Sequence, residues 1–333
     1  MEKENQNFLE VKDLVVEYTS DRRVIHAVNG ISFELKRGRT LGLVGETGAG
    51  KTTIAKSIIR ILPDPPAKIR SGEIWFEGQN LMELPDAEMR KIRGSRISMV
   101  FQDPMTALNP TMRIGDQIAD GIALHEKLSK HEAEEKAMEI LETVGIPRER
   151  YREYPHQFSG GMKQRVVIAI ALACKPDLLL ADEPTTALDV TIQAQVLDLI
   201  NDLKNKNNTA MILITHDLGV VAETCDDVAV VYAGEIVESG SREEIFDDPM
   251  HPYLIGLFGS LPDMAEEGAT RLKPIAGMMP NPSNLPSGCK FHLRCPYATD
   301  ACKEGTVELV DLGGTHKCRC RNVDAVRAEK EAK

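Results

Sequence analysis

Short runs of apolar residues alternate with amphipathic stretches along this chain, and the pattern predicts an α/β fold. Four runs are continuously apolar, as expected for buried strands of a parallel sheet: residues 40–44, 97–101, 178–181 and 211–214. Residues 52–59 instead place apolar side chains on one side at helical spacing. The sequence therefore predicts a helix soon after the first of these strands.

Other segments predict structure outside this core. Residues 9–18 form a further predicted strand. Residues 71–81 predict a hairpin of an antiparallel β subdomain, because polar and apolar side chains alternate through its first half. Residues 114–128 and 131–144 have helical periodicity, and Ser129 is positioned to cap the second of these helices.

The stretch between the first strand and the first helix carries the pattern G-x-x-x-x-G-K-T, matched at Gly45, Gly50, Lys51 and Thr52. Glycines are needed here because backbone N–H groups must point at phosphate oxygens without side chains in the way. We therefore predict a nucleotide site in which Lys51 reaches the β- and γ-phosphates and the Thr52 hydroxyl ligates Mg²⁺. The predicted nucleotide contacts of this loop are Glu46, Thr47, Gly48, Ala49, Gly50, Lys51, Thr52 and Thr53.

An acid pair, Asp182 and Glu183, directly follows the apolar run 178–181. Carboxylates at the carboxyl end of a strand lie where open α/β sheets place their ligands. Asp182 can hold the Mg²⁺ shell through water, and Glu183 can orient or deprotonate an attacking water. The alternative is an ordinary acid pair that caps the next helix, a role open to Asp182 or Asp189.

Two more polar residues end predicted strands in the same way. Gln102 follows the run 97–101, and its neutral oxygen suits Mg²⁺ or the attacking water. His216 lies just beyond the run 211–214, where it can hydrogen-bond a γ-phosphate, although a lone histidine is more often structural.

A second glycine-rich helix start lies at residues 158–165, which read FSGGMKQR. Ser159 and the N–H groups around Gly160 and Gly161 form another helix-start anion site. The chain has one phosphate loop, so it offers no second phosphate loop with which this helix start could share a nucleotide.

This order of motifs resembles the nucleotide-binding subunit of ATP-binding cassette (ABC) transporters over about residues 8–260. The resemblance implies that Tyr18 stacks on adenine, that Gln102 is the Q-loop glutamine and that His216 is the switch histidine. It also makes Asp182 and Glu183 the Walker B pair. The D-loop would be Ala187, Leu188 and Asp189, and the signature motif Ser159, Gly160 and Gly161.

The same resemblance implies a fold and a mode of assembly. The fold is a RecA-like core with an antiparallel β subdomain, an inserted helical subdomain at about residues 109–165, and a small Cys-rich C-terminal extension at 261–333. The helical subdomain would cradle the coupling helix of a membrane subunit. The signature motif would act in trans, capping the γ-phosphate held by a partner's phosphate loop, so that two subunits enclose two ATP molecules. Phe158 and Met162 depart from the commonest signature and match the peptide-importer branch.

The composition of the chain further narrows the class of protein and its expected location. The chain has 333 residues, 42% of them hydrophobic, which suffices for one large core and an appendage. No apolar stretch approaches the roughly 20 residues that span a bilayer, and the polar residues 1–6 are unlike a signal peptide. The net charge of −11 argues against broad nucleic-acid binding. We therefore expect a protein on the cytoplasmic face of the membrane, attached through partners.

Five of the seven cysteines lie in the last fifth of the chain: Cys289, Cys295, Cys302, Cys318 and Cys320. A cytosolic protein is not expected to hold structural disulfides, so clustered cysteines favour metal or redox chemistry. Four thiolates suit an iron–sulfur cluster or a tetrahedral zinc, and the spacing of the cysteines alone does not choose between them.

The tail also resembles the C-terminal extension of dipeptide and oligopeptide importer ATPases, through His251-Pro252-Tyr253 and through the pattern from Pro286 to Pro296 that contains Cys289 and Cys295. The resemblance implies a 4Fe–4S cluster. Its ligands would be Cys289, Cys295, Cys302 and Cys320, with Cys318 as the rival fourth ligand. We expect the cluster to hold the short tail together rather than to transfer electrons.

The function implied is ATP hydrolysis that drives peptide import. The expected partners are a second, related ABC subunit, two membrane permeases and, indirectly, an extracytoplasmic peptide-binding protein, with no nucleic acid. The alternatives are an importer of nickel or glutathione, a soluble ABC ATPase in DNA or iron–sulfur metabolism, and a redox sensor built on the cassette.

Overall fold

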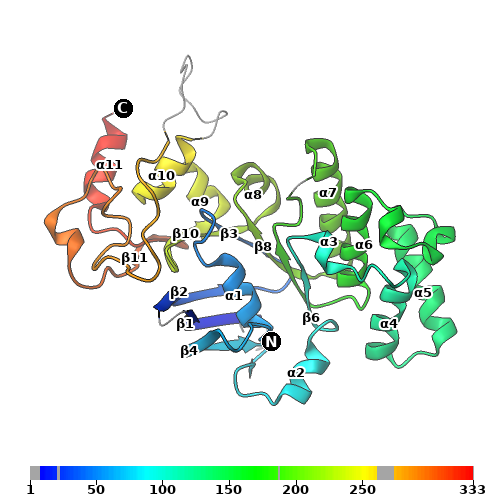
Figure 1. Cartoon of the computed structure of the whole chain (residues 1–333). Helices are drawn as coiled ribbons and strands as arrows, with labels where there is room; N and C mark the ends of the chain where they lie inside the picture. Colours follow the sequence, from blue (N-terminus) through cyan, green and yellow to red (C-terminus); the bar gives the residue numbers. More distant parts are fainter. Residues whose placement is uncertain (1–7, 21–22, 187, 261–273, 333) are drawn as a thin grey trace, which may run out of the picture. The chain divides into compact units, whose positions relative to one another are not determined.

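The computed structural model describes residues 8–20, 23–186, 188–260 and 274–332, and these form two compact units (Figure 1). The first unit holds the segments up to residue 9, 34–40 and 75–215. The second holds residues 10–33, 41–74 and the chain from 216 onward. The predicted boundary between the cassette and the C-terminal extension, at 260/261, borders residues 261–273, which lie outside the described residues. Residues 1–6, which the sequence analysis judged unlike a signal peptide, also lie outside them.

Three parallel strands form the sheet of the first unit: β6 (Ile97–Val100), β7 (Leu178–Asp182) and β8 (Ala210–Thr215). Every residue in them is buried, which is why their sequences read as continuous apolar runs. The three predicted strands are therefore confirmed. The first ends one residue earlier than expected, because Phe101 has left the sheet and is 39% exposed.

The first unit also contains several helices, of which α6 (Gly160–Leu172) packs against β6. Helices α4 (Ile114–Glu126) and α5 (Lys130–Thr143) pack side by side (Figure 1). Ser129 and Glu132 form a reciprocal capping box at the start of α5, so the predicted cap is confirmed. Lys127, at φ 54°, ends α4 in the left-handed conformation. The other helical segments are α2 (Asp86–Ile92), α3 (Pro104–Ala107), η1 (Arg148–Arg152), η2 (Pro155–Gln157) and α7 (Val190–Asn207).

The predicted hairpin is also present. Strand β4 (Ala67–Phe76) turns into β5 (Gln79–Asn80), with Trp75 opposite Asn80 and Phe76 opposite Gln79. Ile74 and Phe76 are buried, in keeping with the alternation in the sequence.

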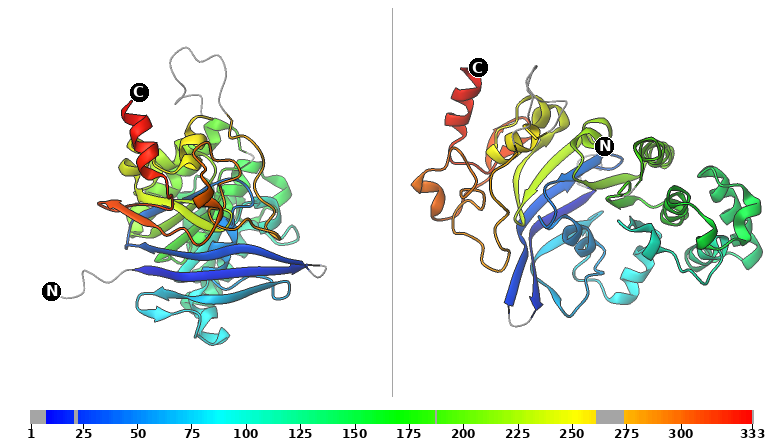
Figure 2. Two further views of the ribbon diagram at one scale, coloured as in Figure 1. Left: turned by 90° about the vertical axis from the view of Figure 1, so that its left-hand side faces the viewer. Right: turned by 45° about the horizontal axis from the view of Figure 1, so that its top comes forward.

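The second unit contains the long strands β1 (Leu9–Ser20) and β2 (Arg23–Leu35), which run side by side (Figure 2). Its larger sheet begins with β3 (Thr40–Val44), which is parallel to β9 (Asp227–Tyr232). Strand β10 (Glu235–Ser241) then pairs antiparallel with β9.

The C-terminal tail adds strands to this same sheet. Strand β12 (His316–Cys318) pairs antiparallel with β10, and β11 (Val310–Gly313) pairs with β12. The tail therefore shares main-chain hydrogen bonds with the unit that carries the phosphate loop. The helical segments of this unit are α1 (Lys51–Ile58), α8 (Leu218–Thr224), α9 (Arg242–Asp247), α10 (Pro252–Phe258), η4 (Asp300–Lys303) and α11 (Val323–Glu331).

Among the described residues, no helix has the length and apolar character needed to cross a membrane.

Candidate functional site

The phosphate loop joins β3 to α1, and two of its glycines are fixed by close packing. A Cβ at Gly45 would lie 2.1 Å from the carbonyl oxygen of Val231, and one at Gly50 would lie 2.3 Å from that of Ala27. Gly48 adopts φ +86° at the exposed tip of the loop, with no described atom within 4 Å of a Cβ built there. Gly45 and Gly50 thus let the loop pack closely, and Gly48 lets it turn while leaving its outer side open.

Lys51 begins α1 and lies over the loop that precedes it. Its Nζ donates to the carbonyl oxygens of Gly45 (2.6 Å) and Glu46 (3.0 Å), and the residue is only 5% exposed. The ammonium is therefore held among the loop carbonyls, the position from which the predicted contact with the β- and γ-phosphates would be made. Nearby, the Tyr18 hydroxyl lies 3.3 Å from Thr53 Oγ1, which places this predicted adenine-stacking residue beside the same helix.

Asp182 and Glu183 sit at the end of β7 in different environments. Asp182 is the last residue of the strand, pairs in register with Ile214 and is 2% exposed. Glu183 follows it at φ 45°, and its Oε2 accepts hydrogen bonds from Gln102 Nε2 (2.8 Å) and the Thr186 hydroxyl (2.8 Å). The structure therefore brings Gln102 to Glu183. Thr186 was missed, because nothing in its sequence surroundings distinguishes it.

His216 follows β8 and is exposed, whereas Asp217 caps α8 by accepting from Gly219 N (2.9 Å) and Val220 N (3.3 Å). His216, Lys51 and Tyr18 belong to the second unit, and Gln102 and Glu183 to the first. The predicted roles of these residues stay predictions at this point.

The second glycine-rich motif starts α6. Ser159 is its N-cap and accepts from Met162 N (3.4 Å), as the sequence suggested for a helix start. No described atom lies within 4 Å of a Cβ built at Gly160, whereas one at Gly161 would lie 2.7 Å from Ile192 Cγ2. Gly161 thus permits the close approach of α6 and α7, and Gly160 leaves the helix start open.

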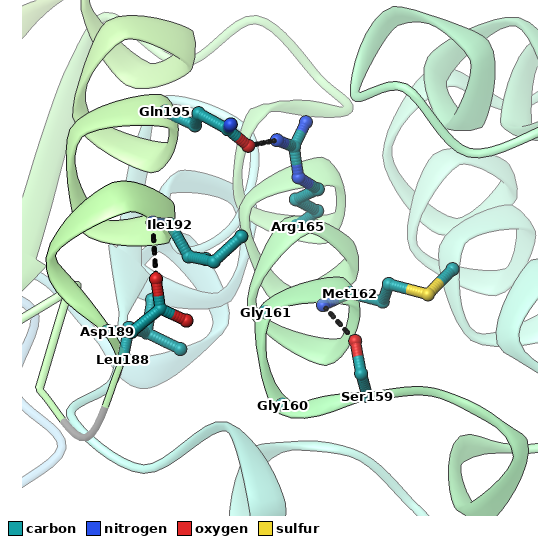
Figure 3. Close-up of a pocket in the computed structure, with 9 residues that line it drawn as sticks. All are labelled: Ser159, Gly160, Gly161, Met162, Arg165, Leu188, Asp189, Ile192 and Gln195. Carbon is teal, nitrogen blue, oxygen red and sulfur yellow. Dashed lines mark hydrogen bonds between the residues drawn. The ribbon is translucent and has the colours of Figure 1, made fainter.

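This helix start borders a pocket of about 530 Å³ between α6 and α7 (Figure 3). Asp189 caps α7 from the other side, with Oδ1 accepting from Ile192 N (3.0 Å), so the capping role weighed for Asp189 is confirmed. The predicted D-loop residue Ala187 lies outside the described residues. The pocket is lined by Ser159, Gly160, Gly161, Met162, Arg165, Leu188, Asp189, Ile192 and Gln195.

Gln164 ties α6 to the acid pair and was also missed by the sequence analysis. It is 2% exposed, and its Nε2 donates to the carbonyl oxygen of Pro184 (2.6 Å), one residue beyond Glu183. A buried glutamine on an otherwise apolar helix face is the signal that singles it out in retrospect.

The tail cysteines fall into two environments. Burial is the main reason that the pKa of the Cys295 thiol is raised to about 12, and the thiols of Cys320, Cys289 and Cys302 raise it further. Cys289 N also donates to the carbonyl oxygen of Cys302 (2.9 Å).

Cys318 is different, because it is fully buried in an apolar cluster with Met250 and Val323. Burial raises its thiol pKa as well. Among the described residues, no three His, Cys, Asp or Glu side chains are gathered closely enough to hold a metal ion.

Comparisons with protein-family models and solved structures assign this chain to the same class of protein as its motifs do. Residues 28–186 match the family model described as ABC transporter, and residues 237–302 match the model described as the C-terminal region of oligopeptide/dipeptide transporters. The chain is similar to the ATP-binding cassette MJ0796, solved as a dimer in a post-hydrolysis state with ADP and phosphate. The two share 26% identity at a TM-score of 0.63, over 70% of this chain and 98% of the other.

Curated relatives cover nearly the whole chain. The oligopeptide transport ATP-binding protein OppD of Bacillus subtilis is 50% identical over 92% of this chain and 87% of its own length. The dipeptide transport ATP-binding protein DppD of the same organism is 50% identical over 89% of each chain.

Fold and motifs together define an ABC-type ATPase, whose ATP hydrolysis is coupled to transport. Within that class, the chain belongs to the ATP-binding proteins of the oligopeptide/dipeptide ABC transporter family.

Proposed function

We propose that this chain is the subunit that hydrolyses ATP to drive import of dipeptides or oligopeptides through partner membrane permeases. Over about nine-tenths of its length, the chain is 50% identical to proteins named for oligopeptide and dipeptide transport. The observation that carries hydrolysis itself is the Glu183 carboxylate, held 2.8 Å from the Gln102 amide directly beyond the buried Asp182. That arrangement supplies a positioned base next to a residue suited to the Mg²⁺ shell.

Each motif residue then has a role in the proposed reaction. Tyr18 stacks on adenine, and Lys51 with the loop N–H groups binds the phosphates. Thr52, Gln102 and Asp182 offer the oxygen ligands that Mg²⁺ prefers, so this donor set fits the ion in kind. Bound with ATP, Mg²⁺ neutralises charge on the phosphate oxygens. Glu183 orients and deprotonates the attacking water, and His216 hydrogen-bonds the γ-phosphate.

Replacing Glu183 with glutamine tests the assignment of the general base. Glu183→Gln keeps the shape of the side chain but removes its basicity, so we expect ATP binding to persist and hydrolysis to fall by about 10²–10⁴-fold. Binding is measured with a fluorescent ATP analogue and turnover by phosphate release from the assembled transporter. Asp198→Asn, an acid-to-amide change on α7, is the matched control. Turnover in Glu183→Gln close to that of the control would sink the assignment.

We further propose that Ser159, Gly160 and Gly161 serve ATP held by another subunit. The open helix start at Gly160 and the pocket beside it support this role, since both can receive an anion from outside the chain. The other subunit is a second, related cassette, and the pair acts beneath two permeases that receive peptide from an extracytoplasmic binding protein. The chain would then lie at the cytoplasmic face of the membrane, with the helical subdomain at about residues 109–165 contacting the permease.

The solute is tested by transport itself. We expect the transporter reconstituted in vesicles to take up dipeptides or oligopeptides when ATP is supplied on the side of this subunit. Uptake of nickel or glutathione in place of peptide would show that the transporter is a nickel or glutathione importer instead. ATPase activity stimulated by nucleic acid would select the DNA-linked alternative.

In the tail, which we assign to residues 261–333, we propose a 4Fe–4S cluster held by Cys289, Cys295, Cys302 and Cys320. Thiolates are the ligands of such clusters, and a main-chain hydrogen bond joins Cys289 to Cys302. Among the described residues no three of these side chains are gathered closely enough to hold a metal, so binding would have to draw them together. Cys318 is the weaker candidate, because its sulfur lies in an apolar cluster with Met250 and Val323. A cluster would cross-link a segment with little core of its own. Zinc bound by the same thiolates is the alternative.

Cysteine substitutions separate these possibilities. We expect protein purified without oxygen to contain iron and acid-labile sulfide, and Cys295→Ser to contain less iron, because one of the four thiolate ligands is removed. Cys318→Ser is the matched control and is expected to keep them. Protein that contains zinc and no sulfide would show that these cysteines form a zinc site instead of an iron–sulfur cluster. An ATPase rate that changes when the cluster is reduced would favour the redox-sensor alternative.

A further inference from the structure

Glu46, the second residue of the phosphate loop, forms an ion pair with Arg294 near the C-terminal end of the chain. The Glu46 carboxylate accepts two hydrogen bonds from Arg294, Nη1 to Oε2 at 2.8 Å and Nη2 to Oε1 at 3.0 Å. The two residues are 248 positions apart in the sequence, and both belong to the second unit. The Arg294 side chain is 6% exposed and the Glu46 side chain 29%, so this is a bidentate ion pair whose guanidinium is largely shielded from water and whose carboxylate is partly exposed.

Arg294 is itself held in place by several groups of the C-terminal region. Its Nε donates to the carbonyl oxygen of Ala276 (3.0 Å), and Nη1 also approaches the Tyr232 hydroxyl (3.4 Å). Its guanidinium carbon lies 5.8 Å from the centre of the Phe291 ring. A guanidinium fixed on three sides loses little freedom when it binds a carboxylate, which favours a stable pair.

A second contact reaches the backbone at the same residue. Glu46 N donates to the Tyr253 hydroxyl at 2.8 Å. The Tyr253 ring packs against Tyr232 and Phe291, with centroids 4.6 and 5.5 Å apart, and Tyr253 and Phe291 are both 2% exposed or less. The N–H of Glu46 is therefore turned toward this aromatic cluster.

These contacts bear on phosphate binding through charge and through geometry. An unpaired carboxylate in the loop would repel the phosphates of ATP, and Arg294 neutralises that charge. The carbonyl oxygen of Glu46 also accepts from Lys51 (3.0 Å), so fixing Glu46 fixes one of the groups that hold the Lys51 ammonium. Glu46 is therefore better assigned to positioning the loop than to binding nucleotide.

We propose that Arg294 and Tyr253 are positioning residues for the phosphate loop, so that the affinity of this cassette for nucleotide depends on its C-terminal region. The proposal rests on the proposed nucleotide site at Lys51. It also links the tail cysteines to the nucleotide site, because Arg294 directly precedes Cys295 in the chain.

Charge substitutions at the two partners test the ion pair. We expect Arg294→Gln to raise the Kd for ATP by about tenfold, within the range typical of coupled sites, because it leaves Glu46 unpaired near the phosphates. Glu46→Gln alone should raise the Kd less, since it removes the repelling charge itself. The double variant Arg294→Gln/Glu46→Gln should therefore bind ATP more tightly than Arg294→Gln. In Arg294→Gln, kcat at saturating ATP should stay within about twofold of wild type, because Arg294 does not touch the reacting atoms.

A matched arginine separates positioning from simple loss of tail stability. Arg321 also binds tail carbonyls, those of Ala301 and Thr306, and among the described residues it has no hydrogen bond to the phosphate loop. We expect Arg321→Gln to lower the melting temperature without changing the Kd for ATP. Equal effects of Arg294→Gln and Arg321→Gln on the Kd, or a double variant no better than Arg294→Gln, would refute the proposal.

The same assay distinguishes this inference from the site on which it rests. Lys51→Ala is expected to abolish ATP binding at this cassette. Retained binding in that variant would overturn the nucleotide site. Loss of binding in Lys51→Ala, together with an unchanged Kd in Arg294→Gln, would leave the site standing and overturn the role of the tail.

Discussion

Glu183 shows how a single residue can be held ready for chemistry. At φ 45° it adopts a left-handed backbone conformation that costs a non-glycine residue about 1–3 kcal/mol. Its N–H donates to the carbonyl oxygen of Ile214 (2.9 Å) while Gln102 and Thr186 donate to its carboxylate. These three bonds fix both the backbone and the side chain. The strained conformation therefore aims the carboxylate, as expected of a residue whose direction matters more than its stability.

Glu244 gives a residue-scale prediction about pH. Its carboxylate accepts from Ser241 N (2.8 Å) and Thr315 N (3.0 Å), joining the start of α9 to the tail. Burial raises its pKa, but hydrogen bonds from the Thr315 side chain and from the backbone of Ser241 and Thr315 outweigh that effect and lower it to about 2. Because the folded-state pKa lies below the unfolded value, the carboxylate stabilises the fold above about pH 4.5, and this stabilisation is lost as the pH falls toward about 2.

We therefore expect Glu244→Gln to lower the free energy of unfolding by about 1 kcal/mol at pH 7, the usual worth of a helix cap. The difference from wild type should shrink as the pH falls from 4.5 toward 2. Urea unfolding at a series of pH values measures it. Glu243→Gln, on the exposed side of α9, is the control and should change little, since surface ion pairs contribute weakly. A Glu244 effect that did not depend on pH would contradict the titration argument.

At the scale of elements, the sequence predicted most of what positions the site. The strands at residues 40–44, 178–181 and 211–214 were predictable because buried parallel strands are apolar on both faces. The cap at Ser129 was predictable because a capping box is a local pattern. The phosphate loop was predictable for the same reason, since its glycine spacing is set by the backbone conformation that phosphate binding requires.

Contacts between distant elements were not predictable in this way. Gln164 reaches the carbonyl of Pro184, and Arg294 reaches Glu46, through side chains whose partners lie far along the chain. Neither contact leaves a periodic pattern in the sequence, because each joins one pair of residues and depends on how whole elements pack. The same holds for β12, a three-residue strand whose pairing with β10 places the tail on the sheet.

At the scale of the whole molecule, the proposed trans-acting site gives the last prediction. Gly160 is open and Gly161 is not, although both lie at the start of α6. We expect Gly160→Val to fold normally and to bind ATP at its own phosphate loop, because a Cβ at this position has no described atom beyond its own turn of helix within 4 Å. The same side chain would fill the anion site that another cassette's γ-phosphate must enter, so hydrolysis by the assembled pair should fall by about 10²-fold or more, the usual cost of removing a preorganised anion contact.

Gly161→Val separates this effect from damage to the fold. Its side chain would press on Ile192, so we expect a lower melting temperature in addition to lost activity. ATP-dependent pairing is measured by light scattering with Glu183→Gln in the background, which holds ATP unhydrolysed. We expect Gly160→Val to prevent that pairing while its melting temperature matches wild type. Pairing and hydrolysis at wild-type levels in Gly160→Val would mean that the open helix start does not serve a partner's nucleotide, and the two glycine-rich motifs would then have to act within one chain.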